Sequence, residues 1–251
     1  MVQARPHISV VSPVYMAEGC IAELCARLKK TLGKISKNFE IILVEDGSPD
    51  GSWRQIQAEA QEDHRIKGIR LAKNVGQHRA IAAALDLARG DWVVVMDCDL
   101  QDPPEAIRVL YSKALEGNDL VVARFEERRE SALRRRISRT FWSFLNWLSG
   151  LKFDPDSGNF RIMSAKVVES LRDYREQIRL LGGLSSMIGF NQTSVSINRD
   201  DRYSGKTSYT LRKLLSVAAQ ISVAYSDKPL KLFLFFGFIV ATASVSAGLV
   251  L

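Results

Sequence analysis

Short apolar runs alternate with longer stretches of mixed polarity through the first half of the chain. Four of the runs have the length and bounding polar residues of buried strands: residues 8–12, 39–44, 66–71 and 91–95. The stretches between them are expected helices: one with Ile21, Leu24, Leu28 and Leu32 at helical spacing, one over residues 52–63, and one over residues 79–88 that Gly90 ends. Strand alternating with helix predicts an α/β fold built on a doubly wound, mostly parallel sheet.

Acidic pairs follow two of these strands. Glu45 and Asp46 come after the second strand, and Asp97 and Asp99 come after the fourth. Open α/β sheets bind ligands at the carboxyl ends of their strands, so both pairs are expected to face one crevice. Carboxylates crowded together repel each other unless they share a cation, and oxygen ligands suit Mg²⁺ or Mn²⁺. The D-x-D predicts a metal–diphosphate site, with a plain strand-end cap as the alternative.

The residues around the D-x-D carry further expectations. Cys98 is expected to face away from the aspartates and to pack in the core. Asp102 is the expected N-cap of a helix whose first turn holds two prolines. His78 either contacts a phosphate from a helix N-terminus or is structural. Neither G-x-G-x-x-G nor a Walker A lysine loop is present, so the usual dinucleotide and P-loop sites lack their glycines.

The pattern changes in the second half of the chain. An arginine-rich stretch with an apolar stripe, residues 134–148, resembles a helix in a membrane interface, with a core-facing helix as the alternative. Residues 211–229 predict an amphipathic juxtamembrane helix. Residues 230–251 predict a transmembrane helix, because no charge occurs after Lys231. Residues 1–210 are then the catalytic domain.

Lysines before the apolar run set its expected orientation. Lys228 and Lys231 place the preceding domain in the cytoplasm by the positive-inside rule, at the inner membrane in a bacterium. The apolar run ends where the chain ends, and we interpret the sequence as a piece of a longer protein rather than one with a single tail span.

Charge and cysteine content narrow the classes of partner and of site that the protein can have. The 251 residues carry a formal net charge of +7, which favours nucleic acid, an anionic membrane or phosphorylated substrates as partners. The basic residues gather beside the aromatic helices, which favours lipid phosphate and argues against nucleic acid. The three cysteines form no C-x-x-C pair, so neither a zinc site nor a disulfide framework is indicated.

Several motifs then point to one family. They are Pro13-Val14-Tyr15, Val44-Glu45-Asp46-Gly47-Ser48, Asn74-x-Gly76 and Asp97-x-Asp99-x-Gln101-Asp102-Pro103-Pro104-Glu105. Together they resemble the family 2 glycosyltransferases of the GT-A fold. Ser157-Gly158-Asn159-Phe160-Arg161 and the segment from Arg202 to Tyr209 look like the polyprenyl-phosphate glycosyltransferases, a subgroup with dolichyl-phosphate mannose synthase and undecaprenyl-phosphate sugar transferases.

The resemblance implies an activity. It is the inverting, metal-dependent transfer of a sugar from a nucleotide sugar, with a UDP-sugar preferred, to a polyprenyl phosphate at the cytoplasmic membrane face. The alternatives are a GT-A enzyme acting on another lipid or glycan acceptor, and a non-catalytic membrane-bound nucleotide-binding module. A homo-oligomer is expected because some relatives form tetramers.

The resemblance also implies roles for residues. Pro13, Tyr15 and Glu18 border the nucleoside, and Glu45 or Asp46 contacts its base or ribose. Asp97 and Asp99 hold the diphosphate and the Mg²⁺ or Mn²⁺, with Gln101 beside them. The cations expected to bind the donor diphosphate and the acceptor phosphate are Arg124, Arg161, Arg202 and Lys206, joined by Arg135 and Arg139. Lys206 stands two positions earlier than the lysine of the family's G-x-S-K-Y ending.

Overall fold

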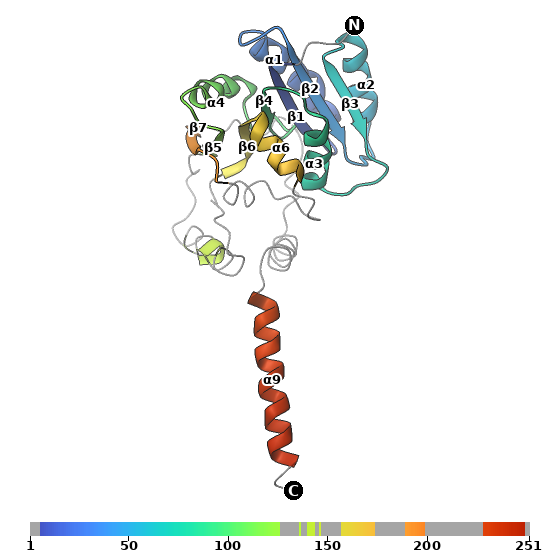
Figure 1. Cartoon of the computed structure of the whole chain (residues 1–251). Coiled ribbons are helices and arrows are strands. Elements are labelled where there is room, and N and C mark those ends of the chain that lie inside the picture. The colour runs from blue at the N-terminus through green and yellow to red at the C-terminus, as the bar shows by residue number, and fades with distance from the viewer. Residues whose placement is uncertain are drawn as a thin grey trace. The chain divides into compact units, whose positions relative to one another are not determined.

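A computed structural model gives the fold, and it describes residues 6–125, 136, 140–143, 146, 157–173, 189–198 and 228–248. The chain divides into two compact units (Figure 1). One comprises Met1–Arg129 and Asp154–Thr207, and the other comprises Glu130–Phe153 and Ser208–Leu251. The boundaries expected at residues 210 and 229 stay predictions.

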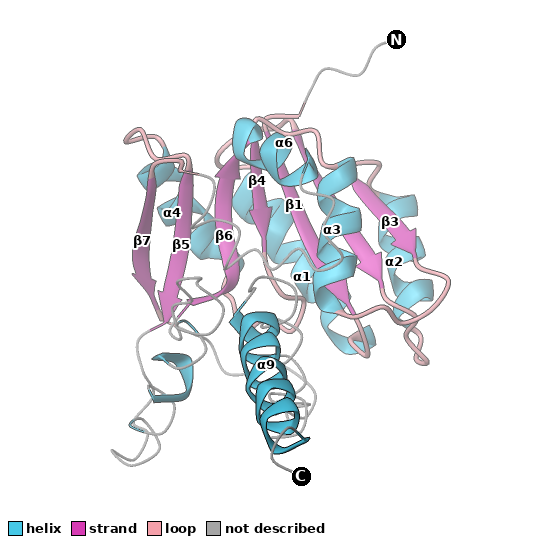
Figure 2. Cartoon of the chain, turned by 60° about the horizontal axis from the view of Figure 1, so that its bottom comes forward, coloured by secondary structure: helices cyan, strands magenta, loops and turns pink. Residues whose placement is uncertain are grey.

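The first unit is built on a mixed sheet. The described strands are β1 Ile8–Val14, β2 Phe39–Glu45, β3 Ile66–Arg70, β4 Trp92–Val95, β5 Leu120–Phe125, β6 Ser157–Ser164 and β7 Gln192–Ile197. Their order across the sheet is β3-β2-β1-β4-β6-β5-β7 (Figure 2). β6 runs antiparallel to both β4 and β5, and the other neighbouring strands are parallel. The α/β prediction is confirmed, with one reversed strand inside the sheet.

Helices cover both faces of this sheet (Figure 2). They are α1 Glu18–Leu32, α2 Ser52–Glu62, α3 Gln77–Leu87, the 3₁₀ turn η1 Pro104–Ala106, α4 Ile107–Ala114 and α6 Ala165–Asp173. The apolar stripe of α1 packs on one face, where α1 contacts α2 and α4, and α3 packs with α6. The three helices expected from the sequence are therefore present, and each connects two parallel strands.

The end of α3 differs from the prediction. The helix stops at Leu87, and its C-cap residue is Ala88, so Gly90 does not end it. Arg172 of α6 instead donates to the carbonyl oxygens of Leu85, at 2.7 Å from Nη2, and of Ala88. Gly90 has a different reason to be glycine, because a Cβ there would lie 2.5 Å from the backbone nitrogen of Ser9.

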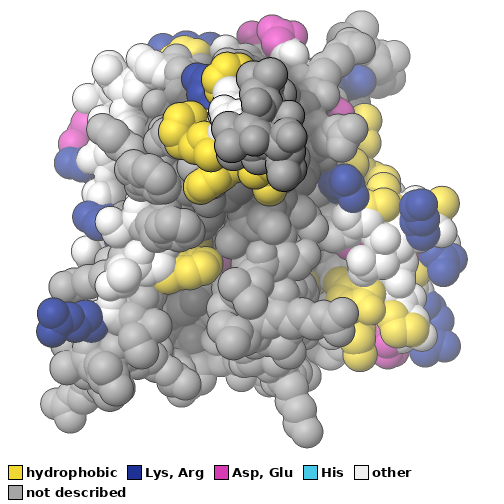
Figure 3. All heavy atoms as spheres, turned by 90° about the horizontal axis from the view of Figure 1, so that it is seen from below, with side chains coloured by type: hydrophobic (Ala, Val, Ile, Leu, Met, Phe, Trp, Pro, Cys, Tyr) yellow, Lys and Arg dark blue, Asp and Glu magenta, His cyan; other side chains and the backbone are white. Residues whose placement is uncertain are grey.

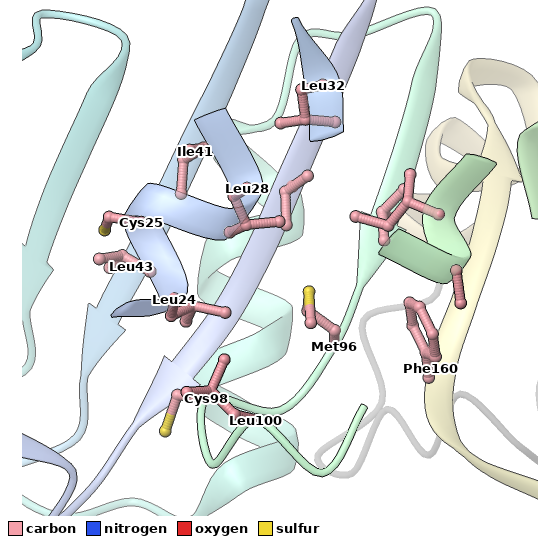
Figure 4. Close-up of a cluster of buried hydrophobic side chains, with 14 of the residues drawn as sticks. Leu24, Cys25, Leu28, Leu32, Ile41, Leu43, Met96, Cys98, Leu100 and Phe160 are labelled. Atoms are coloured by element: carbon pink, nitrogen blue, oxygen red, sulfur yellow. The ribbon is translucent and has the colours of Figure 1, made fainter. Parts of the chain in front are cut away.

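The core beneath α1 also anchors the loop after β4. Leu24, Leu28 and Leu32 of α1 are fully buried against the sheet (Figure 4). Cys98 and Leu100 belong to the same cluster, at 7% and 1% exposure. The prediction that Cys98 is a packing residue is confirmed, and burial raises the pKa of its thiol. Two apolar side chains thus hold the D-x-D loop from below.

The second unit contains α9, Lys228–Gly248. Its described side chains are exposed, including Phe233 at 75% and Phe238 at 72%, and Figure 3 shows apolar side chains at the surface beside scattered lysines and arginines. No helix in the described ranges has both the length and the apolar character that crossing a bilayer requires, so the span expected over residues 230–251 lacks support.

The two other helices expected in this part of the chain are covered unevenly. The described positions of the 134–148 stretch are helical, and Thr140 Oγ1 donates to the Arg136 carbonyl oxygen at 3.0 Å. The helix expected over residues 211–229 lies, up to residue 227, outside the described residues.

Candidate active site

The loops after β1 and β2 are joined by hydrogen bonds. The backbone N–H of Met16 donates to Ser48 Oγ at 2.7 Å, and that of Gly51 donates to Glu18 Oε2 at 3.0 Å. Pro13 is buried within β1, whereas the Tyr15 side chain is 48% exposed. Pro13, Tyr15 and Glu18, the expected nucleoside border, therefore run from the end of β1 to the first residue of α1, across a loop that is hydrogen-bonded to the loop after β2.

Asp46 connects the β2 loop to the segment before α3. Its carboxylate is 3% exposed and accepts hydrogen bonds from the N–H groups of Val75, at 2.7 Å, and Gly76, at 2.9 Å. Its carbonyl oxygen accepts from Asn74 Nδ2 at 2.9 Å. Gly47 has φ +64°, and a Cβ on it would collide with the backbone of Asn74, so this contact requires glycine.

Glu45 is also engaged within the protein. It is fully buried, it accepts from the Ser48 N–H, and Arg70 Nε lies 3.2 Å from its Oε2. Both acidic residues of this pair thus fix loops at the carboxyl edge of the sheet. A contact of either with a base or ribose stays a prediction.

Asp97 lies where three elements meet. Its Oδ1 accepts a hydrogen bond from Gln77 Nε2 at 2.6 Å, at the first residue of α3, and from Asn159 Nδ2 at 3.3 Å, in β6. The antiparallel register pairs Val95 with Arg161, and continuing it by two residues sets Asp97 opposite Asn159. Because Gln77 follows Gly76 directly, the segment that binds Asp46 also reaches Asp97, and both acidic loops share one edge as predicted.

The loop after Asp97 is a tight turn. Asp99 Oδ1 accepts from the Gln101 N–H at 3.1 Å, and Leu100 between them has φ +61°. Left-handed backbone at a residue other than glycine costs about 1–2 kcal/mol, and such strain concentrates at functional sites. Here the turn points Leu100 into the core and leaves Asp99 and Gln101 partly exposed.

The expected role of Asp102 is wrong. The turn η1 begins at Pro104 after Pro103 and has no side-chain cap. Asp102 is 1% exposed, and its Oδ2 accepts from the backbone N–H of Asp97 at 3.4 Å. The carboxylate faces back toward β4 and closes the loop, so it does not reach the helix start.

The donor atoms near this loop fit a hard cation. Asp97 and Asp99 offer carboxylate oxygens one residue apart, the ligand type that Mg²⁺ and Mn²⁺ prefer. Within the described ranges no group of three or more His, Cys, Asp or Glu side chains forms a metal site. A cation of this kind takes one or two carboxylates and completes its shell with water and substrate phosphates, so two carboxylates match that arrangement.

Arg161 is the buried cation of the site. It is 2% exposed in β6, and it donates from Nε to the Asn159 carbonyl oxygen at 3.1 Å and from Nη2 to the Gly158 carbonyl oxygen at 2.8 Å. Burial lowers its pKa to about 10, an effect that the charge of Asp97 opposes, so the guanidinium remains protonated at neutral pH. Burial, and then the charge of Arg161, lower the pKa of His78.

Of the other expected phosphate-binding cations, the structure describes Arg124 alone. Arg124 is exposed at the end of β5. Arg135, Arg139, Arg202 and Lys206 lie outside the described residues. Sequence reasoning gave no role to Gln77 and Asn159, which are neutral amides, although Gln77 directly follows Asn74-x-Gly76 and Asn159 lies within the motif from Ser157 to Arg161.

Comparison with known proteins identifies the family. Residues 9–174 match the model of glycosyl transferase family 2. The chain belongs to this family. An uncharacterized glycosyltransferase, YkcC of Bacillus subtilis (strain 168), is 36% identical over 225 residues, 89% of this chain and 70% of the relative. This chain is thus a family 2 glycosyltransferase, an enzyme class, with the family resemblance confirmed.

Two relatives carry more specific names. An undecaprenyl-phosphate 4-deoxy-4-formamido-L-arabinose transferase of Shewanella sediminis (strain HAW-EB3) is 30% identical over 97% of this chain and 74% of its own length. A prophage bactoprenol glucosyl transferase homolog of Escherichia coli (strain K12) is 31% identical over 96% of this chain and 79% of its own.

Solved glycosyltransferase structures share the fold. The mannosyltransferase PcManGT of Pyrobaculum calidifontis, in complex with GDP-Man and Mn²⁺, aligns with TM-score 0.59 at 18% identity, over 91% of this chain and 65% of that one. Glucosyl-3-phosphoglycerate synthase of Mycobacterium tuberculosis, with Mn²⁺, UDP and phosphoglyceric acid, aligns with TM-score 0.59 at 19% identity, over 86% and 76%. The family 2 glycosyltransferase therefore has a GT-A-like mixed sheet.

Proposed function

We propose that this family 2 glycosyltransferase transfers a sugar from a nucleotide sugar to a polyprenyl phosphate, with inversion, at the cytoplasmic face of a membrane. The observation that carries the proposal is that Gln77 of α3 and Asn159 of β6 both donate hydrogen bonds to Asp97 in the D-x-D loop. This places partly exposed carboxylates at the edge of the sheet where an α/β fold binds its ligand. The names of the undecaprenyl-phosphate and bactoprenol relatives support the acceptor.

The donor is proposed to lie along the joined loops. Pro13, Tyr15 and Glu18 border the nucleoside, and Asp46 holds the neighbouring segment. UDP is the preferred nucleotide, and UDP and GDP-Man occur in structural neighbours that also contain Mn²⁺. When bound at Asp97 and Asp99, Mg²⁺ or Mn²⁺ neutralises charge that develops on the diphosphate leaving group.

The acceptor phosphate needs cations more than a base. A phosphate monoester has a second pKa near 6, so it is mostly dianionic at neutral pH and is nucleophilic without a strong general base. Arg124, Arg202 and Lys206, with Arg135 and Arg139, are proposed to hold it beside the anionic donor against their mutual repulsion. The exposed apolar side chains of α9, together with the arginines and the apolar stripe in the sequence of residues 134–148, support membrane association of the enzyme.

The test is a product analysis. Membranes containing the protein are incubated with undecaprenyl phosphate, Mn²⁺ and a panel of UDP- and GDP-sugars, and the lipid fraction is examined by mass spectrometry. We expect a lipid phosphate heavier by one sugar residue, formed from one donor and lost when EDTA removes the metal. Sugar transfer to a protein or glycan, with no lipid product from any donor, would contradict the proposed acceptor. Size-exclusion chromatography of the protein, solubilised from the same membranes in detergent, tests the expected homo-oligomer.

A further inference from the structure

The position of Arg161 is unusual for a residue that binds phosphate. Its side chain is buried in the sheet, and no carboxylate lies within ion-pair distance of it in the described part of the chain. Both of its printed hydrogen bonds go to main-chain carbonyl oxygens, those of Gly158 and Asn159. Binding a phosphate with the same two N–H groups would release these partly buried carbonyl oxygens.

The carbonyls that Arg161 binds belong to the segment that orients Asp97. Asn159 has its carbonyl oxygen held by Arg161 and its side-chain amide donated to Asp97 Oδ1. The guanidinium is planar and presents its donors in a fixed fork, so two simultaneous bonds restrict the backbone at residues 158 and 159. A restricted backbone limits the directions in which the amide of Asn159 can point.

A second support reaches Asp97 from a different element, α3. Gln77 donates to the same oxygen at 2.6 Å, and the segment before it is held by the carboxylate of Asp46. Asp97 is therefore oriented by α3 and by β6 at once, and Arg161 controls the β6 half.

We propose that Arg161 is a positioning residue, which fixes Asn159 and through it sets the carboxylate of Asp97 to receive the metal and diphosphate of the donor. This inference rests on the proposed function, because it assigns a use to the orientation of Asp97. The charge of Asp97 opposes the effect of burial on the pKa of Arg161, which agrees with their proximity. Residues that orient a metal-binding side chain typically change metal affinity about 10–100-fold when they are removed.

Another arginine of the chain is a matched control. Arg172 also donates to two main-chain carbonyl oxygens, those of Leu85 and Ala88, but at the opposite end of α3 from Gln77. Arg172→Met thus removes the same type of contact from the same unit without touching the D-x-D loop. It reports what the loss of an arginine fork on main-chain carbonyl oxygens does to the fold alone.

The first experiment measures amide hydrogen exchange of the ligand-free full chain. Arg161→Met is expected to speed exchange in peptides covering residues 96–102 and 157–160, and Arg172→Met is expected to speed exchange near residues 85–88 only. Unchanged exchange at residues 96–102 in Arg161→Met would overturn the positioning role. Because no ligand is present, this result does not depend on the proposed function.

The second experiment measures binding of UDP, and separately GDP, with Mn²⁺ by calorimetry. Arg161→Met and Asn159→Ala are each expected to weaken binding about 10–100-fold, and Arg172→Met to leave it within about twofold. The double variant Arg161→Met/Asn159→Ala should bind as weakly as Asn159→Ala alone, since both act through one link. Additive losses would show that Arg161 contacts the ligand itself and would overturn the inference.

The experiments distinguish failure of the proposed function from failure of the positioning role of Arg161. A wild-type chain that binds neither nucleotide with Mn²⁺ would contradict the proposed function, whatever the exchange data show. If Arg161→Met does not fold, Asn159→Ala carries the test, because it removes only the side-chain amide. Wild-type affinity in a folded Asn159→Ala variant would overturn the positioning of Asp97.

Discussion

Two acidic sites at opposite ends of the same sheet are built in contrasting ways. Glu40, near the start of β2, is 3% exposed and accepts from Ser9 Oγ at 2.5 Å, the Arg89 N–H at 2.8 Å and Lys67 Nζ at 2.6 Å. Asp97, past the end of β4, is partly exposed and accepts from the neutral amides of Gln77 and Asn159.

The two sites differ in the charge of the groups that bind their carboxylates. The carboxylate of Glu40 is neutralised by Lys67, so this network is complete within the chain. The D-x-D loop carries Asp97, Asp99 and the buried Asp102, and the donors described for the partly exposed Asp97 are neutral amides, which add no positive charge. A complete ion pair stabilises a fold, whereas partly exposed carboxylates can coordinate a cation from solution.

The largest expected effect is at the D-x-D loop. Asp99→Ala should slow sugar transfer by more than about 100-fold, because the metal ion proposed to stabilise the leaving group loses one of its carboxylate ligands. The rate of lipid-linked product formation measures it, and circular dichroism should show an intact fold. Asp86→Ala, on the exposed side of α3, is the matched control. Normal turnover in Asp99→Ala would refute the metal assignment.

A smaller effect is expected one contact away. Gln77→Ala removes the 2.6 Å hydrogen bond to Asp97 and should weaken binding of UDP with Mn²⁺ about 10–100-fold. Isothermal titration calorimetry gives the affinity. Gln55→Ala removes a glutamine of α2 that bonds Glu59 at 3.5 Å and should leave binding unchanged. Equal affinities of the two variants would show that Asp97 needs no support from α3.

The Glu40 network should respond in stability and not in activity. Glu40→Gln is expected to lower the free energy of unfolding by about 1–3 kcal/mol, because a buried donor set loses its charged acceptor. Urea denaturation measures this, with Glu62→Gln on the surface of α2 as control. A variant that lost transfer activity while keeping its stability would mean that the two ends of the sheet are not separate in function.

The smallest expected effect is the pH dependence of the stability difference between the wild type and Glu40→Gln. Burial alone raises the pKa of Glu40, but hydrogen bonds from Lys67, Ser9 and Arg89 outweigh it and hold the pKa below its ordinary value of 4.5. A depressed folded-state pKa contributes stability that is present above 4.5 and is lost as pH falls through the folded value. The stability gap between wild type and Glu40→Gln should therefore be constant near neutrality and narrow on acidification. A gap that widens below pH 4.5 would contradict this.

Local pattern was enough to predict the framework. The apolar runs that became β1, β2 and β4 have every residue or nearly every residue buried, so their composition carries a strong signal. The D-x-D was placed correctly because it follows such a run directly. The core position of Cys98 followed from the alternation of side chains.

Long-range pairing was beyond local pattern. Asn159 is 62 residues from Asp97, and it reaches Asp97 only because β6 enters the sheet in reverse beside β4. The N-cap role expected for Asp102 failed for a different reason, since its carboxylate accepts from the Asp97 N–H within the same loop and makes no cap hydrogen bond at the start of η1. The buried partners of Glu45 and Asp46 likewise depend on loops that come from separate strands.

The direction of β6 also sets when the site can exist during synthesis. Asp97 and Asp99 leave the ribosome well before residues 157–161, and the order β4-β6-β5 requires the later strand to enter between two earlier ones. A nascent chain that ends before β6 thus carries the D-x-D without Asn159 or Arg161. The growing polypeptide therefore acquires the orientation of Asp97 by Asn159 late, once β6 has entered the sheet between β4 and β5.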